Sequence, residues 1–189
     1  PAQFDPLGSV YARDLGVQTM AAYAGYLAVM IPLAVLVNPW VGLLSCLGEE
    51  FAWRAYLLPK LREGFAPAPA VVLTGAIWGL WHAPFIAMGY NYGAEHPLFG
   101  IAAMVIFCVV LGCIEGALFF QVQSVWPVAL LHASLNALDL AAPSDLFMSQ
   151  PSNPFLGPDP IGILGGAGLI AAGIYCLYRL VRAGHSEQP

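Results

Sequence analysis

Charged residues are scarce in this chain of 189 residues. Asp, Glu, Lys and Arg make up 9% of it and hydrophobic residues 59%, whereas a soluble domain carries about 25% charged residues. So few charges could not cover a protein surface in water, but lipid tails solvate apolar side chains without them. The composition therefore argues against a soluble domain and indicates a membrane protein.

Other scarcities narrow the functions that the chain can have. It has six Lys and Arg residues and a net charge of −5, so it offers no basic footprint and we expect no nucleic-acid partner. Its four cysteines form no CxxC pair and lie in apolar runs, which predicts buried thiols rather than disulfides or a zinc knuckle. The chain shows no signal-peptide pattern and starts at Pro1 rather than Met, so we expect a trimmed product.

Long apolar runs, in contrast, are abundant. A membrane-spanning helix needs about 20 residues, and six runs approach this length, at about 19–37, 40–61, 68–88, 98–121, 125–142 and 161–181. We predict an all-α fold, a polytopic membrane helix bundle of about six transmembrane helices. Residues 1–18 form a surface segment, 19–182 a single membrane-embedded domain and 183–189 a polar tail, with a loop at 143–160.

The distribution of basic residues supports six spans and gives them an orientation. If the spans alternate in direction, five basic residues fall on one side, while the opposite loops contain Glu95, Asp145 and Asp159 without Lys or Arg. The positive-inside rule then places both termini in the cytoplasm. No internal repeat is present, so an inverted-repeat transporter has no support. The five basic residues are Arg13, Lys60, Arg62, Arg179 and Arg182.

Several polar residues lie inside the predicted spans, where each costs several kcal/mol unless it is paired or hydrated. At about 1.5 Å per residue, Glu49 and His82 lie roughly 20 Å from the cytoplasmic ends, Asn136 roughly 17 Å and His132 roughly 10 Å. Three helices therefore present polar faces at similar depth, which indicates one shared site. The intramembrane polar residues are Glu49, Glu50, Arg54, His82, Glu115, His132, Asn136 and Asp139.

The first motif is EExxxR, at Glu49, Glu50 and Arg54. Glu50 and Arg54 are four residues apart, so they share a helix face and can form an ion pair. Glu49 points about 100° away and remains as a spare carboxylate that could bind a water molecule or a metal ion. The alternative is that the motif is a structural ion-pair network.

Two further motifs place a histidine beside another side chain on one helix face. Trp78 and His82 are four residues apart, and Pro84 can kink the helix and release a backbone carbonyl. His132 and Asn136 are also four residues apart and could aim two hydrogen-bond donors at one oxyanion. Interhelical hydrogen bonding without chemistry is the alternative for both motifs.

Taken in order, EExxxR, aromatic-xxx-H and HxxxN resemble the CPBP family over about residues 40–140. This family groups the CAAX prenyl endopeptidases with bacterial bacteriocin-processing and immunity-type (Abi) proteins. The resemblance implies that Glu49 and His82 hold and activate a water molecule, with Glu49 as the general base. It implies that His132 and Asn136 stabilise the oxyanion, while the ion pair of the first motif supports the site.

The resemblance also implies a glutamate-type intramembrane endopeptidase without a cofactor. Its partners would be the lipid bilayer and a peptide or protein substrate, and its location the bacterial inner membrane. A zinc-dependent hydrolase with Glu49, His82 and His132 as ligands stays open, because two His and one Glu form a known catalytic zinc set, although no HExxH motif is present. A non-catalytic immunity or binding protein of the same fold is a further alternative, and a proton relay a weaker one.

Two positions depart from the family pattern. Trp78 stands where Phe is usual, so the face stays aromatic. Glu115 lies in the fourth span, where the family commonly has an apolar residue. Glu115 could pair with Arg54, bind a substrate cation or face a polar cavity, and the sequence does not choose among the three.

Overall fold

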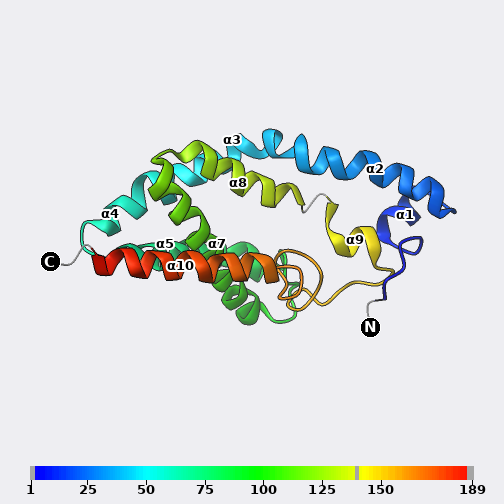
Figure 1. Ribbon diagram of the computed structural model, residues 1–189. Coiled ribbons are helices and arrows are strands. Elements are labelled where there is room, and N and C mark those ends of the chain that lie inside the picture. Colours follow the sequence, from blue (N-terminus) through cyan, green and yellow to red (C-terminus); the bar gives the residue numbers. More distant parts are fainter. Residues whose placement is uncertain (1–2, 139–140, 187–189) are drawn as a thin grey trace. The chain divides into compact units, whose positions relative to one another are not determined.

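The computed structural model describes residues 3–138 and 141–186 and is built from helices (Figure 1). Within this part of the chain, extended pairing is limited to an isolated β-bridge between Phe4 and Met148, so the all-α prediction is confirmed. Asp139 and residues 187–189 of the predicted tail lie outside the described residues. The elements are α1 (Val10–Asp14), α2 (Met20–Leu36), α3 (Asn38–Glu50), η1 (Phe51–Leu57), α4 (Leu58–Arg62), α5 (Pro67–Trp81), α6 (Ala83–Ala87), α7 (Pro97–Val122), α8 (Val125–Leu138), α9 (Pro143–Phe147) and α10 (Ala167–Ser186).

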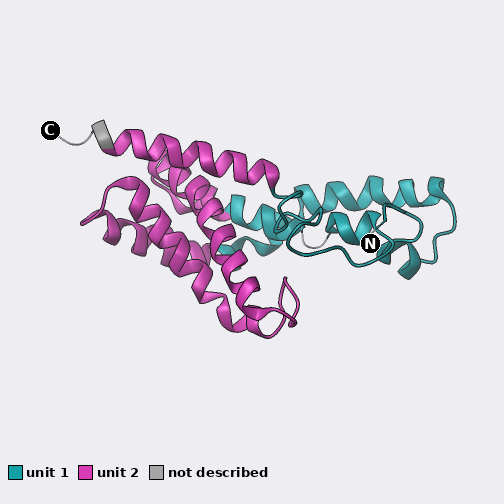
Figure 2. Cartoon of the chain, turned by 90° about the horizontal axis from the view of Figure 1, so that it is seen from below, with its two compact units in different colours: residues 1–46, 130–166 teal, residues 47–129, 167–189 magenta. Residues whose placement is uncertain are grey.

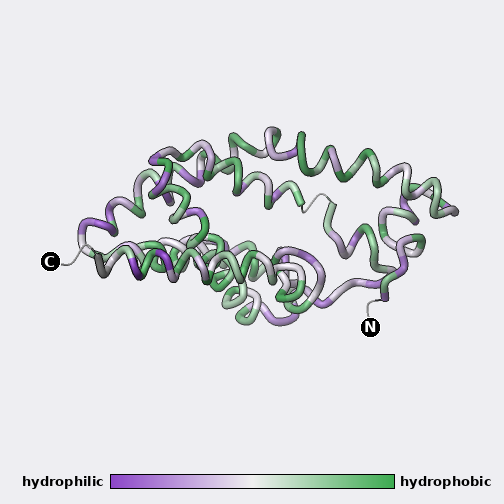
Figure 3. The backbone as a smooth tube through the Cα atoms, in the orientation of Figure 1, coloured by the Kyte–Doolittle hydropathy of each residue, from purple (hydrophilic) through white to green (hydrophobic). Residues whose placement is uncertain are grey.

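Among the described residues, three stretches are long and apolar enough to cross a membrane, namely Met20–Arg62, Pro97–Val122 and Val125–Phe147. The helix α5 is also apolar but shorter. Hydrophobic residues run along these helices (Figure 3), and large apolar side chains of α2 such as Val29 and Leu36 are exposed, as expected for a surface that faces lipid. The chain is therefore an integral membrane protein, and the count of six spans stays a prediction.

The second predicted span combines three elements, α3, η1 and α4. The middle element is a π-helix of seven residues, Phe51–Leu57, and such wide helical turns are rare and frequently lie at functional sites. The third predicted span is divided at His82 into α5 and α6. Pro84 explains this break because its ring nitrogen has no N–H to donate to the preceding turn.

The sixth predicted span begins too early. Helix α10 starts at Ala167, and residues 161–166 form turns instead. Gly162, Gly165 and Gly166 explain the late start, because each glycine costs about 1 kcal/mol in a helix relative to alanine. The predicted loop at 143–160 also contains the short helix α9, and its Ser144 donates from N–H (2.9 Å) and hydroxyl (2.7 Å) to the Asp159 carboxylate.

The chain divides into two compact units, coloured separately in Figure 2. Unit 1 contains residues 1–46 and 130–166. Within it, Tyr23 is fully buried, lies 3.1 Å from the Ser9 hydroxyl and donates to the Leu146 carbonyl over 2.7 Å. Tyr23 thereby ties α2 to α1 and α9.

Unit 2 contains residues 47–129 and 167–189, and α7 packs there against both α5 and α10. Close contact with α5 depends on Gly75 and Gly79. A Cβ atom at Gly75 would lie 2.7 Å from the Val109 Cα, and one at Gly79 would lie 2.5 Å from the Val105 Cα. These two small residues, four positions apart on α5, therefore let two helix backbones lie against each other.

Replacing Gly79 by Ala should destabilise the protein by about 1–3 kcal/mol, because the new methyl group meets backbone atoms that cannot move aside. Gly48→Ala is the matched control, since nothing lies within 4 Å of its added Cβ atom. Thermal unfolding of both variants in detergent measures the difference. Equal melting temperatures for the two would show that α5 and α7 do not pack as described.

Candidate functional site

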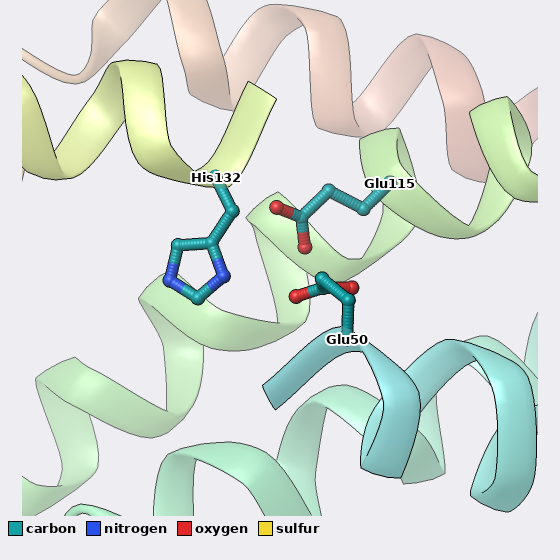
Figure 4. A group of neighbouring side chains, drawn as sticks. All are labelled: Glu50, Glu115 and His132. Carbon is teal, nitrogen blue, oxygen red and sulfur yellow. The ribbon is translucent and has the colours of Figure 1, made fainter. Parts of the chain in front are cut away.

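Three charged side chains from two segments form a buried cluster in unit 2. The Arg54 Nη1 atom lies 2.9 Å from Glu50 Oε1, as the four-residue spacing predicts, and Nη2 forms an ion pair with Glu115 of α7. All three side chains are at most 1% exposed. Figure 4 shows the carboxylates of Glu50 and Glu115 facing each other. Of the three roles left open for Glu115, pairing with Arg54 is the one found.

Burial makes this cluster strongly interdependent. A buried charge that loses its partner costs several kcal/mol, so each carboxylate needs the Arg54 guanidinium. The guanidinium also lies over the Trp78 ring, 4.5 Å from its centroid, a distance at which cation–π attraction adds to the ion pairs. Arg54 therefore links the EExxxR segment to both α5 and α7.

Trp78 contacts the two residues that the sequence predicts to handle water. Its indole Nε1–H donates to Glu49 Oε2 over 3.0 Å, and its backbone carbonyl accepts from His82 Nδ1 over 2.9 Å. Trp78 itself is 2% exposed, so surrounding atoms hold it in place. One buried residue thus positions both Glu49 and His82.

The end of α5 explains why the Trp78 carbonyl can bind an imidazole. The His82 backbone N–H donates to the Gly79 carbonyl over 3.2 Å, which leaves the Trp78 carbonyl for the His82 side chain. Because a carbonyl only accepts, His82 Nδ1 carries the hydrogen and Nε2 keeps a lone pair in the neutral ring. The break that Pro84 predicts therefore sets the tautomer of His82.

Exposure separates the carboxylates into two kinds. Glu50 and Glu115 are fully buried and bound to Arg54, whereas Glu49 and His82 are partly exposed. Trp81 packs edge-on against His82 with centroids 5.0 Å apart, and Trp53 packs against Trp81 at 6.0 Å. Aromatic rings thus border His82, while Glu49 and His82 stay partly accessible to water.

His132 and Asn136 lie one turn apart on α8, as predicted, and belong to unit 1. His132 is 4% exposed. Asn136 is exposed, and its Nδ2 atom donates to the Cys46 sulfur over 3.5 Å. The predicted oxyanion pair therefore lies wholly in unit 1, whereas the alternative zinc ligand set of Glu49, His82 and His132 combines residues of both units. Both roles stay predictions.

Sequence reasoning missed the part that Trp78 plays. The motif predicts only an aromatic side chain at this position, yet the indole N–H of Trp78 donates a hydrogen bond to Glu49. The signal was present in the departure from the family pattern, because Trp carries a donor that Phe lacks. A buried Trp usually finds a partner for this group, and here the partner is the Glu49 carboxylate.

Comparison with known proteins agrees with the motifs. A family model described as type II CAAX prenyl endopeptidase Rce1-like matches residues 25–138. A protein named CAAX prenyl protease 2 from Methanococcus maripaludis is 36% identical over 53 residues, which cover 28% of this chain and 20% of that relative. The chain thus matches about a fifth of that relative's length. No solved structure matches the chain.

Proposed function

Because this chain belongs to the type II CAAX prenyl endopeptidase Rce1-like family, we propose that it is a membrane-embedded endopeptidase whose water nucleophile is activated by Glu49 and His82. The observation that carries this proposal is the double contact of Trp78, which binds Glu49 through its indole and His82 through its carbonyl. These contacts use one oxygen of Glu49 and one nitrogen of His82. They leave Glu49 Oε1 and His82 Nε2 to accept hydrogen bonds from water.

Hydrolysis then follows the general-base route. Glu49 takes a proton from the water molecule, and the water oxygen attacks the scissile carbonyl carbon. The tetrahedral intermediate collapses with cleavage of the C–N bond, and Glu49 returns the proton to the leaving amine. His82 orients the water through its Nε2 lone pair, a task for which the Nδ1–H···O=C bond supplies the correct tautomer.

We assign stabilisation of the oxyanion to His132 and Asn136 because they form the HxxxN motif of the family. Preformed donors aimed at a developing negative charge are worth about 10²–10³-fold in rate. Glu50 is assigned a supporting role with Arg54. It is an unsuitable base because it is fully buried and its Oε1 atom is bound to Arg54.

The substrate would be a peptide or protein segment that reaches the membrane. The family and the relative from Methanococcus are both named for CAAX prenyl substrates, so a prenylated peptide is the first to test. We further propose that the protein lies in the bacterial inner membrane. Its basic residues favour an orientation with both termini in the cytoplasm.

Purified protein in proteoliposomes tests the function directly. A farnesylated peptide ending in a CAAX sequence and the same peptide without the prenyl group are incubated with it, and mass spectrometry detects a released C-terminal fragment. We expect release from at least one of the two. If neither is cut, comparison of membrane and secreted peptides from wild-type and Glu49→Ala cells searches for another substrate, and identical peptide sets would reject the proposal.

Replacing Trp78 by Phe should lower kcat by about 10- to 100-fold and leave KM unchanged. The substitution keeps the ring and the backbone carbonyl but removes the hydrogen bond to Glu49. A hydrogen bond to a charged group is worth about 1.5–3 kcal/mol, which corresponds to this change in rate. Steady-state kinetics on the substrate identified above provide the measurement.

Trp53→Phe is the matched control for this substitution. The indole nitrogen of Trp53 is buried and has no hydrogen-bond partner among the described residues, so its removal should change kcat less than twofold. Similar losses in both variants would mean that the rings, and not the bond from Trp78 to Glu49, determine the rate.

A further inference from the structure

A cavity of about 380 Å³ lies in unit 2, away from the site described above. The end of α4, the start of α5, the end of α7 and one side of α10 form its walls. This volume falls within the range of small-ligand sites, about 300–1,000 Å³. The polar residues that line it include Arg62, Gln121, Gln123, Tyr175 and Arg179.

The polar lining of this cavity carries one sign of charge. Arg62 and Arg179 contribute two guanidinium groups, and no Asp or Glu is among the described residues that line it. The carboxylate of Glu63, which follows Arg62 in sequence, binds Lys60 over 2.8 Å instead. Two arginines in a described lining that holds no carboxylate favour an anion, and Arg binds phosphate through paired N–H donors.

Local contacts orient both arginines, and Arg179 is exposed. Arg62 Nη1 donates to the Phe65 carbonyl over 2.6 Å, and its guanidinium carbon lies 6.0 Å from the centroid of the Phe120 ring. Arg179 Nη1 donates to the Tyr175 hydroxyl over 3.1 Å. A guanidinium carries five N–H donors, so Arg179 keeps others for a ligand.

The position of the cavity points to a lipid ligand. Arg62 is the last residue of the apolar stretch Met20–Arg62, and Gln121 and Gln123 lie at the end of the stretch Pro97–Val122. Because the spans predicted at 40–61 and 98–121 both end beside this cavity, we infer that it lies at the level of the headgroups. Phe120 and Leu180 supply apolar lining that acyl chains could contact.

We propose that this cavity binds the phosphate of an anionic phospholipid headgroup through Arg62 and Arg179. Basic pockets between transmembrane helices are known to hold such headgroups. The glutamines and Tyr175 can hydrogen-bond the remaining headgroup oxygens. The lipid would thereby hold the end of α4 against α10, since the two arginines belong to these helices.

Native mass spectrometry of the full chain in detergent tests this proposal with phosphatidylglycerol as the probe. Arg62→Gln combined with Arg179→Gln should weaken retention of the lipid about tenfold or more, because each substitution removes a charge-assisted hydrogen bond to the lipid phosphate. Arg13→Gln combined with Arg182→Gln is the control. It removes the same charge, and Arg182 binds Tyr178 over 2.9 Å much as Arg179 binds Tyr175, but neither residue lines the cavity.

A second measurement uses the unmutated chain and does not depend on how the variants fold. Cys176 lines the cavity and is partly exposed, whereas Cys46, Cys108 and Cys113 are buried. Phosphatidylglycerol should slow alkylation of Cys176 by a maleimide at least fivefold, and phosphatidylcholine or glycerol phosphate at equal concentration should not. Equal lipid loss in the control variant, or equal protection by glycerol phosphate, would overturn the proposal.

Discussion

Replacing Glu49 by Gln is expected to lower the rate of peptide cleavage by about 10²–10⁴-fold, the usual contribution of a general base. The amide oxygen of Gln can still accept the hydrogen bond that Trp78 Nε1 gives to Glu49 Oε2. The fold should therefore persist while the base is lost. Rates on the purified variant, together with an unchanged melting temperature, provide the measurement.

Glu95→Gln is the control for this loss of charge, because Glu95 lies in an exposed segment between α6 and α7. Its activity should equal that of the wild type. A chelator arm separates the proposed mechanism from the zinc alternative, since a metal-free enzyme keeps its rate in chelator. Full activity of Glu49→Gln would reject Glu49 as the base, and stoichiometric zinc with loss of activity in chelator would favour the metal mechanism.

Replacing Arg54 by Met is expected to destabilise the protein by about 3–5 kcal/mol, the cost of leaving buried charges without a partner. Arg54 binds both Glu50 and Glu115, and none of the three side chains is more than 1% exposed. The variant therefore leaves two carboxylates facing each other without the cation between their helices. Thermal or SDS-induced unfolding measures the loss.

Neutralising the whole cluster should recover much of this stability. In a variant that combines Glu50→Gln, Arg54→Met and Glu115→Gln, no buried charge of the cluster remains. Replacing all members of a buried ion pair by hydrophobic residues is often neutral or stabilising, and glutamine at the two acidic positions at least removes the unpaired charges. A triple variant as unstable as Arg54→Met alone would show that Arg54 stabilises the fold by packing and not by neutralising Glu50 and Glu115.

The sequence predicted those features that depend on neighbours along the chain. Apolar runs located the helices because hydrophobic length decides whether a segment can span a bilayer. The four-residue spacing of Glu50 and Arg54 predicted their ion pair because one helical turn brings such positions together. Pro84 likewise predicted the break after Trp81, since the loss of an N–H is a local event.

The sequence did not predict features that depend on contacts between distant segments. The partner of Glu115 was undecided because Arg54 lies 61 positions earlier in the chain, and only the packing of α7 brings them together. The bond from Trp78 to Glu49 likewise joins separate helices. The wide turn of η1 and the late start of α10 show that composition places a helix more reliably than it defines its shape or ends.

The central claim is that Glu49 activates a water molecule to cut a peptide bond. Cleavage in water enriched in ¹⁸O tests it most directly, because hydrolysis puts one solvent oxygen into the new carboxyl group. We predict that the wild type yields a fragment with one ¹⁸O atom and that Glu49→Gln yields almost none in the same time. A labelled fragment formed equally fast by both proteins would contradict the claim.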